Sequence, residues 1–173
     1  MCIKIHYLDA SAAVKLVVRE KGSIKLKRYL ECPDRSSNLF MTSFCVAETL
    51  GVLKKRFLKE WCKELGYPTA LRKYWDCCAE FLLQVGRDRL IEVRDIDIGN
   101  LETFAKIERF AKKYKLDVID AFQLVTLNQG FVASLKGTPS ECVLITADKQ
   151  LAKAARDKCL NLRVWNCERG NPP

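Results

Sequence analysis

The chain has 173 residues, of which 49% are hydrophobic and 29% are charged. This length suits a single domain over residues 1–173, and the apolar content is too high for a disordered protein. No apolar run is long enough to span a membrane, and the first residues lack the pattern of a signal peptide, so we expect a cytoplasmic protein. The net charge of +9 favours a polyanionic partner, although a basic surface also serves solubility.

The nine cysteines are expected to be free thiols. Their number is odd, none forms a C-x-x-C pair, and Cys77 and Cys78 are adjacent, which suits neither a zinc site nor a simple disulfide.

Short apolar runs alternate with amphipathic segments along the chain. The apolar, β-branched runs predict strands at residues 3–8, 39–42, 90–93, 142–146 and 162–165. The amphipathic segments predict helices at residues 11–18, 23–31, 43–53, 54–84 with a break at 66–68, 100–114, 115–125 and 149–158, with one extra helical turn at 131–135. This alternation predicts an α/β fold, a three-layer α/β/α domain whose central parallel sheet is covered on both faces.

Side chains that cap helices are visible at several predicted boundaries. Ser11 and Ser43 are expected to be N-caps, and Asp117 stands where the N-cap of the 115–125 helix belongs. The basic residues of segment 54–84 are interpreted mostly as a solvent-exposed face, or as a rim that binds phosphates. The aromatic residues of the same segment are interpreted as core or as a subunit interface. The histidine His6 lies inside the first strand and is interpreted as structural.

Four acidic residues stand out from this pattern. Asp9 and Asp148 each follow a strand and precede a helix, and ligands bind at that place in open parallel sheets. Glu48 and Asp120 lie in apolar helical stretches, where a buried charge needs a partner. Two of them also have a simpler explanation, Asp148 as an N-cap and Glu48 as a solvent-facing residue or one that favours the helix N-terminus electrostatically.

Together, the four acids indicate a metal site. Clustered carboxylates raise one another's pKa unless a cation neutralises them, and all-oxygen sites suit Mg²⁺ or Mn²⁺. Such an ion can polarise a phosphodiester and activate water, so no catalytic histidine or cysteine is needed. Ser11 and Thr146 could orient a carboxylate or water beside the metal, and helix capping accounts for them equally well.

Four motifs in order give the chain a resemblance to PIN-domain ribonucleases, most of all to the VapC-type toxins of prokaryotic toxin–antitoxin pairs. The motifs are Tyr7-Leu8-Asp9-Ala10-Ser11, Val46-Ala47-Glu48-Thr49-Leu50, Asp120-Ala121-Phe122-Gln123-Leu124 and Leu144-Ile145-Thr146-Ala147-Asp148-Lys149-Gln150-Leu151. The resemblance spans essentially the whole chain. The basic region between Glu48 and Asp120 and the connection over residues 129–140 are longer than a minimal member would need.

The resemblance implies a parallel sheet between helices, an endoribonuclease that depends on Mg²⁺ or Mn²⁺, and a homodimer. It implies that Asp9, Glu48, Asp120 and Asp148 form the catalytic, metal-binding cluster, with Thr146 as a polar helper. Asp117 is a less certain extra acid. The implied partners are an RNA substrate and an antitoxin protein whose chain covers the acidic cleft.

Three other functions compete with the toxin. The first is a PIN nuclease that acts in RNA processing or on DNA, and the second is a non-catalytic domain that binds RNA or protein. The third, a phosphatase of the haloacid-dehalogenase type, needs a second acid two residues after Asp9, where this chain has Ser11.

Overall fold

A computed structural model describes residues 4–31, 39–86, 91–93, 96–97, 99–134, 141–157, 160 and 162–173. Within these residues, parallel strands form a five-stranded sheet in the spatial order β3-β2-β1-β4-β5. The strands are β1 (Lys4–Leu8), β2 (Leu39–Thr42), β3 (Ile91–Val93), β4 (Glu141–Thr146) and β5 (Arg163–Asn166). The strand order reverses between β1 and β4, and ligands bind in open parallel sheets outside the carboxyl ends of the strands at such a reversal.

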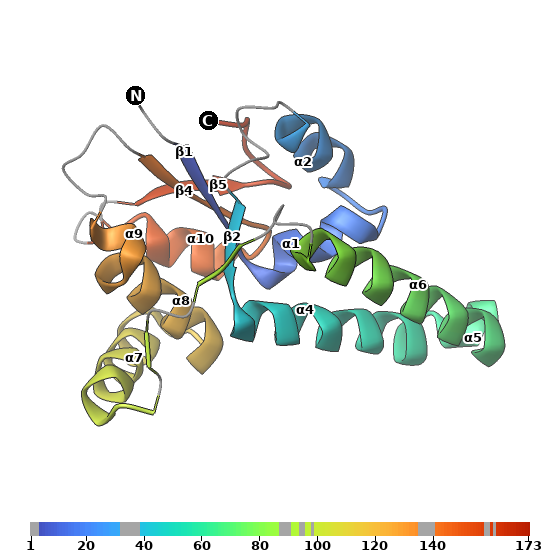
Figure 1. The fold of residues 1–173 in the computed structure, drawn as a ribbon, viewed down its shortest axis with the longest axis horizontal. Helices are drawn as coiled ribbons and strands as arrows, with labels where there is room; N and C mark the ends of the chain where they lie inside the picture. The colour runs from blue at the N-terminus through green and yellow to red at the C-terminus, as the bar shows by residue number, and fades with distance from the viewer. Residues whose placement is uncertain are drawn as a thin grey trace.

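Helices cover both faces of the sheet (Figure 1). The described helices are α1 (Ala10–Val17), α2 (Ser23–Leu30), α4 (Ser43–Lys55), the π-helix η1 (Arg56–Glu60), α5 (Cys62–Leu65), α6 (Tyr67–Gly86), α7 (Leu101–Tyr114), α8 (Val118–Gln129), α9 (Phe131–Ser134) and α10 (Lys149–Ala155).

The alternation of side chains along the strands divides the core into two layers. Leu8 and Ile145 pack with apolar residues of α1 and α2 on one face of the sheet. Their neighbours Tyr7 and Leu144 point to the opposite face and pack with α8, α9 and α10. Because successive side chains of a strand point to opposite faces, one apolar run feeds both layers. The predicted three-layer α/β/α fold is confirmed.

Two predicted N-caps are wrong by one or two residues. The helix α1 begins at Ala10 with Asp9 as its N-cap, not Ser11, and α4 begins at Ser43 with Thr42 as its N-cap. Thr42 is the last residue of β2 and Asp9 directly follows β1, and each carries an oxygen that accepts a first-turn N–H, so each helix starts without a spacer. Asp117 is the N-cap of α8, as predicted, and its side chain accepts from the amide of Asp120 at 2.8 Å.

The long segment after α4 is broken where the sequence predicts. Gly66 separates α5 from α6 with a φ of 75°, in the left-handed region that favours glycine. The π-helix η1 was not predicted, because its wider turn leaves no mark in the apolar pattern. The ends of several other predictions, such as Ile3, Leu90 and Lys158, lie outside the described residues.

His6 is buried, and its Nε2 lies 3.0 Å from the hydroxyl of Tyr29. Six cysteines are free thiols within the described part of the chain, namely Cys45, Cys62, Cys77, Cys78, Cys142 and Cys167. A search of the described helices finds none with the length and hydropathy that a bilayer crossing requires.

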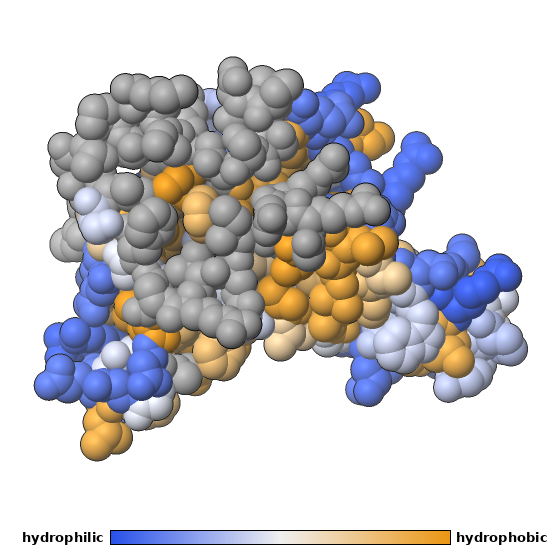
Figure 2. Space-filling model, viewed as in Figure 1, coloured by the Kyte–Doolittle hydropathy of each residue, from blue (hydrophilic) through white to orange (hydrophobic). Residues whose placement is uncertain are grey.

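The helix α6 carries apolar side chains that nothing in the described structure covers. Tyr67, Trp75, Leu82 and Leu83 are largely exposed, whereas Phe81 lies in the core. Figure 2 shows an apolar area over the C-terminal half of this helix. An exposed apolar surface of this kind suits an interface, and the homodimer stays a prediction.

The turn between α1 and α2 depends on Gly22. Its φ is 88°, and a Cβ atom there would lie 2.9 Å from the backbone oxygen of Cys167. We expect Gly22→Ala to lower the free energy of unfolding by about 1–3 kcal/mol, because the left-handed backbone and the clash both disfavour a side chain. Gly51→Ala is the matched control in the interior of α4, where a Cβ meets no neighbour, and it should raise stability by about 0.5–1 kcal/mol. Urea unfolding of both variants measures the difference, and equal stabilities would refute this account of the turn.

Candidate active site

The carboxylate of Asp9 lies at the carboxyl end of β1, and only 2% of the residue is exposed. Its Oδ2 accepts hydrogen bonds from the hydroxyl of Ser11 and from Oγ1 of Thr146 at 2.8 Å. Its Oδ1 accepts from Nε2 of Gln123 at 2.9 Å. Three elements, α1, β4 and α8, therefore fix the orientation of one buried carboxylate, and these bonds offset the cost of removing its charge from water.

The two hydroxyls beside Asp9 also hold the turn after β4. Oγ of Ser11 accepts from the backbone amides of Ala147 at 2.8 Å and Asp148 at 3.2 Å. Oγ1 of Thr146 accepts from the amide of Asp148 at 2.9 Å. The predicted role of Ser11 and Thr146 beside a carboxylate thus has a geometric basis, because each hydroxyl donates to Asp9 and receives an amide.

The turn after β4 is braced from the neighbouring strand by a residue that the sequence analysis missed. The side-chain amide of Asn166, at the end of β5, donates to the carbonyls of Ala147 at 3.1 Å and Asp148 at 3.3 Å. Asp148 in turn is the N-cap of α10, since its Oδ1 accepts from the amide of Leu151 at 2.7 Å. Capping and pocket lining are therefore compatible roles for one carboxylate.

The structure brings all the predicted acids to one pocket of about 300 Å³ at this edge of the sheet. The acidic residues that line it are Asp9, Glu48, Asp117, Asp120, Asp148, Glu20 and Glu168. We call this cavity the acid pocket. The four acids of the predicted cluster come from the end of β1, from α4, from α8 and from the turn after β4. The helix α8 also provides Gln123, one turn after Asp120, which the sequence analysis did not identify as a site residue. The sign of its role in the sequence was a polar side chain within an apolar stretch of the helix.

Two of these acids hold their protons unusually well. Burial raises the pKa of Asp120, and together with the charges of Asp9, Asp117, Asp148 and Glu48 it brings this pKa to about 8. Burial likewise raises the pKa of Glu48 to about 7, with contributions from Asp9, Asp117 and Asp148. Each acid feels the others because like charges in a partly desolvated space disfavour ionisation. Clusters of carboxylates with raised pKa values are typical of functional sites.

The donor set of the acid pocket fits a hard divalent cation. Oε2 of Glu48 is buried and has no hydrogen-bond partner within the described residues, as expected of an oxygen that awaits a ligand. Among the described residues, no three acidic, cysteine or histidine side chains stand close enough to enclose one ion. Mg²⁺ takes oxygen ligands, binds through one or two carboxylates and keeps several waters.

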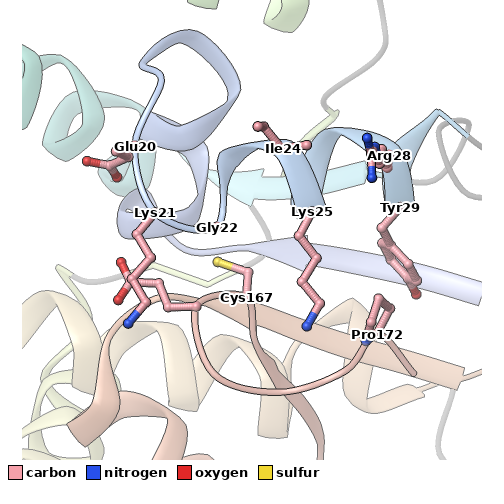
Figure 3. Close-up of a pocket in the computed structure, with 10 residues that line it drawn as sticks. Glu20, Lys21, Gly22, Ile24, Lys25, Arg28, Tyr29, Cys167 and Pro172 are labelled. Atoms are coloured by element: carbon pink, nitrogen blue, oxygen red, sulfur yellow. The ribbon is translucent and has the colours of Figure 1, made fainter.

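A larger pocket lies beside the acid pocket and shares Glu20 and Glu168 with it. It has a volume of about 660 Å³ and opens between α2 and the turn after β5, beside Lys21, Lys25 and Cys167 (Figure 3). Its two carboxylates, Glu20 and Glu168, are both paired with Lys15. The larger volume therefore does not coincide with the predicted acidic cluster.

The fold and the acid pocket together define an α/β/α protein with a carboxylate-lined site at the reversal of strand order. Comparison with protein families matches residues 6–157 to the PIN domain, and the chain belongs to the PIN-domain family. PIN domains are generally nucleases that use divalent metal ions. All four acids of the predicted cluster lie inside the matched residues, whereas Asn166 lies beyond them.

A solved structure supports the fold. The crystal structure of PAE2754 from Pyrobaculum aerophilum is similar with a TM-score of 0.51 and 15% sequence identity, over 89% of this chain and 87% of that chain. A search of curated proteins finds no match.

We expect the metal-free protein to lose stability as the pH rises from about 5 to about 8. The folded-state pKa values of Asp120, about 8, and Glu48, about 7, lie above the ordinary values of their side chains. The folded state therefore binds more protons than the unfolded state in this range, and stability falls as those protons leave. Thermal midpoints in EDTA at a series of pH values measure the effect.

The double variant with Glu48→Gln and Asp120→Asn is the control for this pH dependence. It cannot ionise at either position, so its thermal midpoint should depend less on pH than that of the wild type. At pH 8, Mg²⁺ should raise the thermal midpoint of the wild type and leave the thermal midpoint of the double variant unchanged. Identical pH profiles of the two proteins would mean that these acids do not control stability.

Proposed function

We propose that this protein is an endoribonuclease that depends on Mg²⁺ or Mn²⁺, and that it is the toxin of a VapC-type toxin–antitoxin pair. The observation that carries the proposal is the acid pocket, in which Asp9, Glu48, Asp120 and Asp148 converge from four separate places in the chain. Membership of the PIN-domain family supports a nuclease. The resemblance of the motifs to VapC-type toxins supports the finer assignment.

In this proposal carboxylates of the acid pocket, from Asp9, Glu48, Asp120 and Asp148, would bind a hydrated divalent cation, and the bound ion would supply the Lewis-acid chemistry that phosphodiester cleavage needs. Asp9 contributes a carboxylate that is already oriented by Ser11, Thr146 and Gln123. A fixed ligand of this kind costs no reorganisation during the reaction. Glu48 offers the buried Oε2, and ionisation of Glu48 and Asp120 at neutral pH becomes favourable when a cation is near.

RNA is the proposed substrate because the chain resembles ribonucleases and has a net charge of +9. The proposed protein partner is an antitoxin whose chain covers the acid pocket. The acid pocket would be a suitable place for such inhibition, since a segment lying over it excludes the substrate from the carboxylates.

We expect Asp9→Asn to lower the rate of RNA cleavage by more than about 100-fold, because the variant loses one charge of the proposed metal site and disturbs the bonds that orient it. Purified protein is incubated with structured RNA and single-stranded DNA in Mg²⁺, in Mn²⁺ and in EDTA. Asp76→Asn makes the same chemical change at an exposed position of α6, outside the acid pocket, and should cleave like the wild type. Cleavage that survives Asp9→Asn or EDTA would rule out this site.

The toxin assignment predicts that expression of the wild type arrests the growth of a bacterial host, whereas Asp9→Asn does not. Growth curves after induction of the wild type, Asp9→Asn and Asp76→Asn measure this directly. Metal-dependent cleavage without growth arrest would favour a PIN nuclease of RNA processing or DNA metabolism. Folded, metal-replete protein that cuts neither RNA nor DNA would favour a binding domain.

A further inference from the structure

We propose that Arg56 binds a phosphate of the nucleic acid backbone next to the bond that is cut, and that Glu20 holds it in place. The proposal deepens the proposed function and rests on it. It assigns a ligand class, a backbone phosphate, to a basic side chain inside a pocket otherwise dominated by carboxylates.

One face of α4 runs along the acid pocket from its acidic end to Arg56. Glu48, Val52 and Arg56 are spaced by four residues and all three line the pocket. Residues at this spacing lie above one another on a helix, and eight residues rise by roughly 12 Å. A phosphate bound at Arg56 is therefore displaced along the pocket from Glu48, toward the end that Glu20 lines.

Arg56 stands where the α-helix changes to a π-helix. The helix α4 ends at Lys55, and η1 begins at Arg56, whose carbonyl accepts the amide of Trp61 at 2.8 Å. Short π-helical turns are rare, and many of those that do occur lie at functional sites. The neighbouring Lys54 is exposed and does not line the pocket.

A network of ion pairs holds the side chain of Arg56. Arg56 pairs with Oε2 of Glu20, and Oε1 of Glu20 lies 2.7 Å from Nζ of Lys15. Nζ of Lys15 also donates to Oε1 of Glu168 at 2.7 Å and to the carbonyl of Lys21 at 2.9 Å. Glu20 thus shares its two oxygens between the buried lysine and the arginine, and the lysine holds Glu20 in turn.

Of the two cations that line the acid pocket, Arg56 is the one that can receive a ligand. An ammonium has three N–H donors, and all three donors of Lys15, which is 2% exposed, have acceptors. The side chain of Arg56 is 27% exposed and has one polar partner, Glu20, among the described residues. A guanidinium has five donors, so it can keep Glu20 and still bind a phosphate with two parallel hydrogen bonds.

The positive charge of Arg56 offsets the repulsion between the pocket's carboxylates and an anionic substrate. Until a cation neutralises them, the acids repel the anionic backbone of a nucleic acid. A guanidinium at the other end of the same cavity attracts that backbone, and a planar fork matches phosphate better than an ammonium does. The interaction is with the backbone, so it positions any strand and reads no sequence.

The test compares Arg56→Ala with Lys54→Ala, which removes one positive charge from the last turn of α4, outside the pocket. Both changes are made in the Asp9→Asn background, so that RNA stays intact. Binding of a fluorescein-labelled single-stranded RNA in Mg²⁺ is followed by anisotropy at several salt concentrations. We expect Arg56→Ala to weaken binding by about 5- to 20-fold and to reduce the slope of log K against log salt by about 0.7, the value for one lost phosphate contact. Lys54→Ala should change affinity less than twofold.

Cleavage kinetics provide the second readout, with Asp9 intact. Because Arg56 contacts a phosphate before and during the reaction, Arg56→Ala should raise KM by a similar factor and leave kcat within about twofold. Arg56→Lys should recover part of the affinity, since it restores the charge without the planar fork. Arg56→Gln, which keeps a polar side chain, takes the place of the alanine variant if that variant does not fold.

The outcomes separate this inference from the proposed function. If the wild type cuts RNA and folded Arg56 variants bind and cut like Lys54→Ala, Arg56 is only part of a structural ion pair and the inference is wrong. A changed kcat with unchanged KM would also overturn it. If the wild type neither binds nor cuts RNA in Mg²⁺, the proposed function itself fails.

Discussion

A buried carboxylate at the end of β1 ties together elements that are distant in sequence. Asp9 is the N-cap of α1, accepts from Thr146 of β4 and accepts from Gln123 of α8. A charge in this place is tolerable only because each oxygen has a donor, and each donor is thereby held at the edge of the sheet. The rest of the acid pocket depends on this arrangement, since the turn after β4 and the first turns of α8 bring the other carboxylates beside it.

The acid pocket is electrostatically divided. At one end, burial and mutual repulsion raise the pKa values of Glu48 and Asp120, which is the condition that a divalent cation relieves. At the other end, Glu20 is paired with Lys15 and Arg56, and Glu168 is paired with Lys15. The excess negative charge is thereby confined to the end where the strands terminate. In the proposed nuclease this separation lets one cavity accept both a cation and an anionic substrate.

The pattern of the chain was informative about elements and less so about their ends. The apolar strands and amphipathic helices predicted the α/β/α layers, because burial on both faces of a parallel sheet leaves a plain mark in sequence. The four acids could be singled out because each interrupts or ends such a run. The sequence analysis did not identify Gln123 and Asn166, since an amide side chain in a helix or at a strand end has many ordinary roles. Their contacts appear only in the structure, where Gln123 donates to Asp9 at 2.9 Å and Asn166 donates to the carbonyl of Ala147 at 3.1 Å.

The sequence by itself determined the fold class and singled out four acids that line one pocket, since hydrophobic periodicity and polar interruptions are local properties of the chain. Only the tertiary structure decided which side chains share a cavity. It made Asp9 rather than Ser11 the N-cap, paired Lys15 with Glu168 across the molecule, and separated Arg56 from the exposed lysines beside it. Such pairings depend on where distant elements meet and on the π-turn at Arg56, and neither follows from the spacing of residues along one helix or strand.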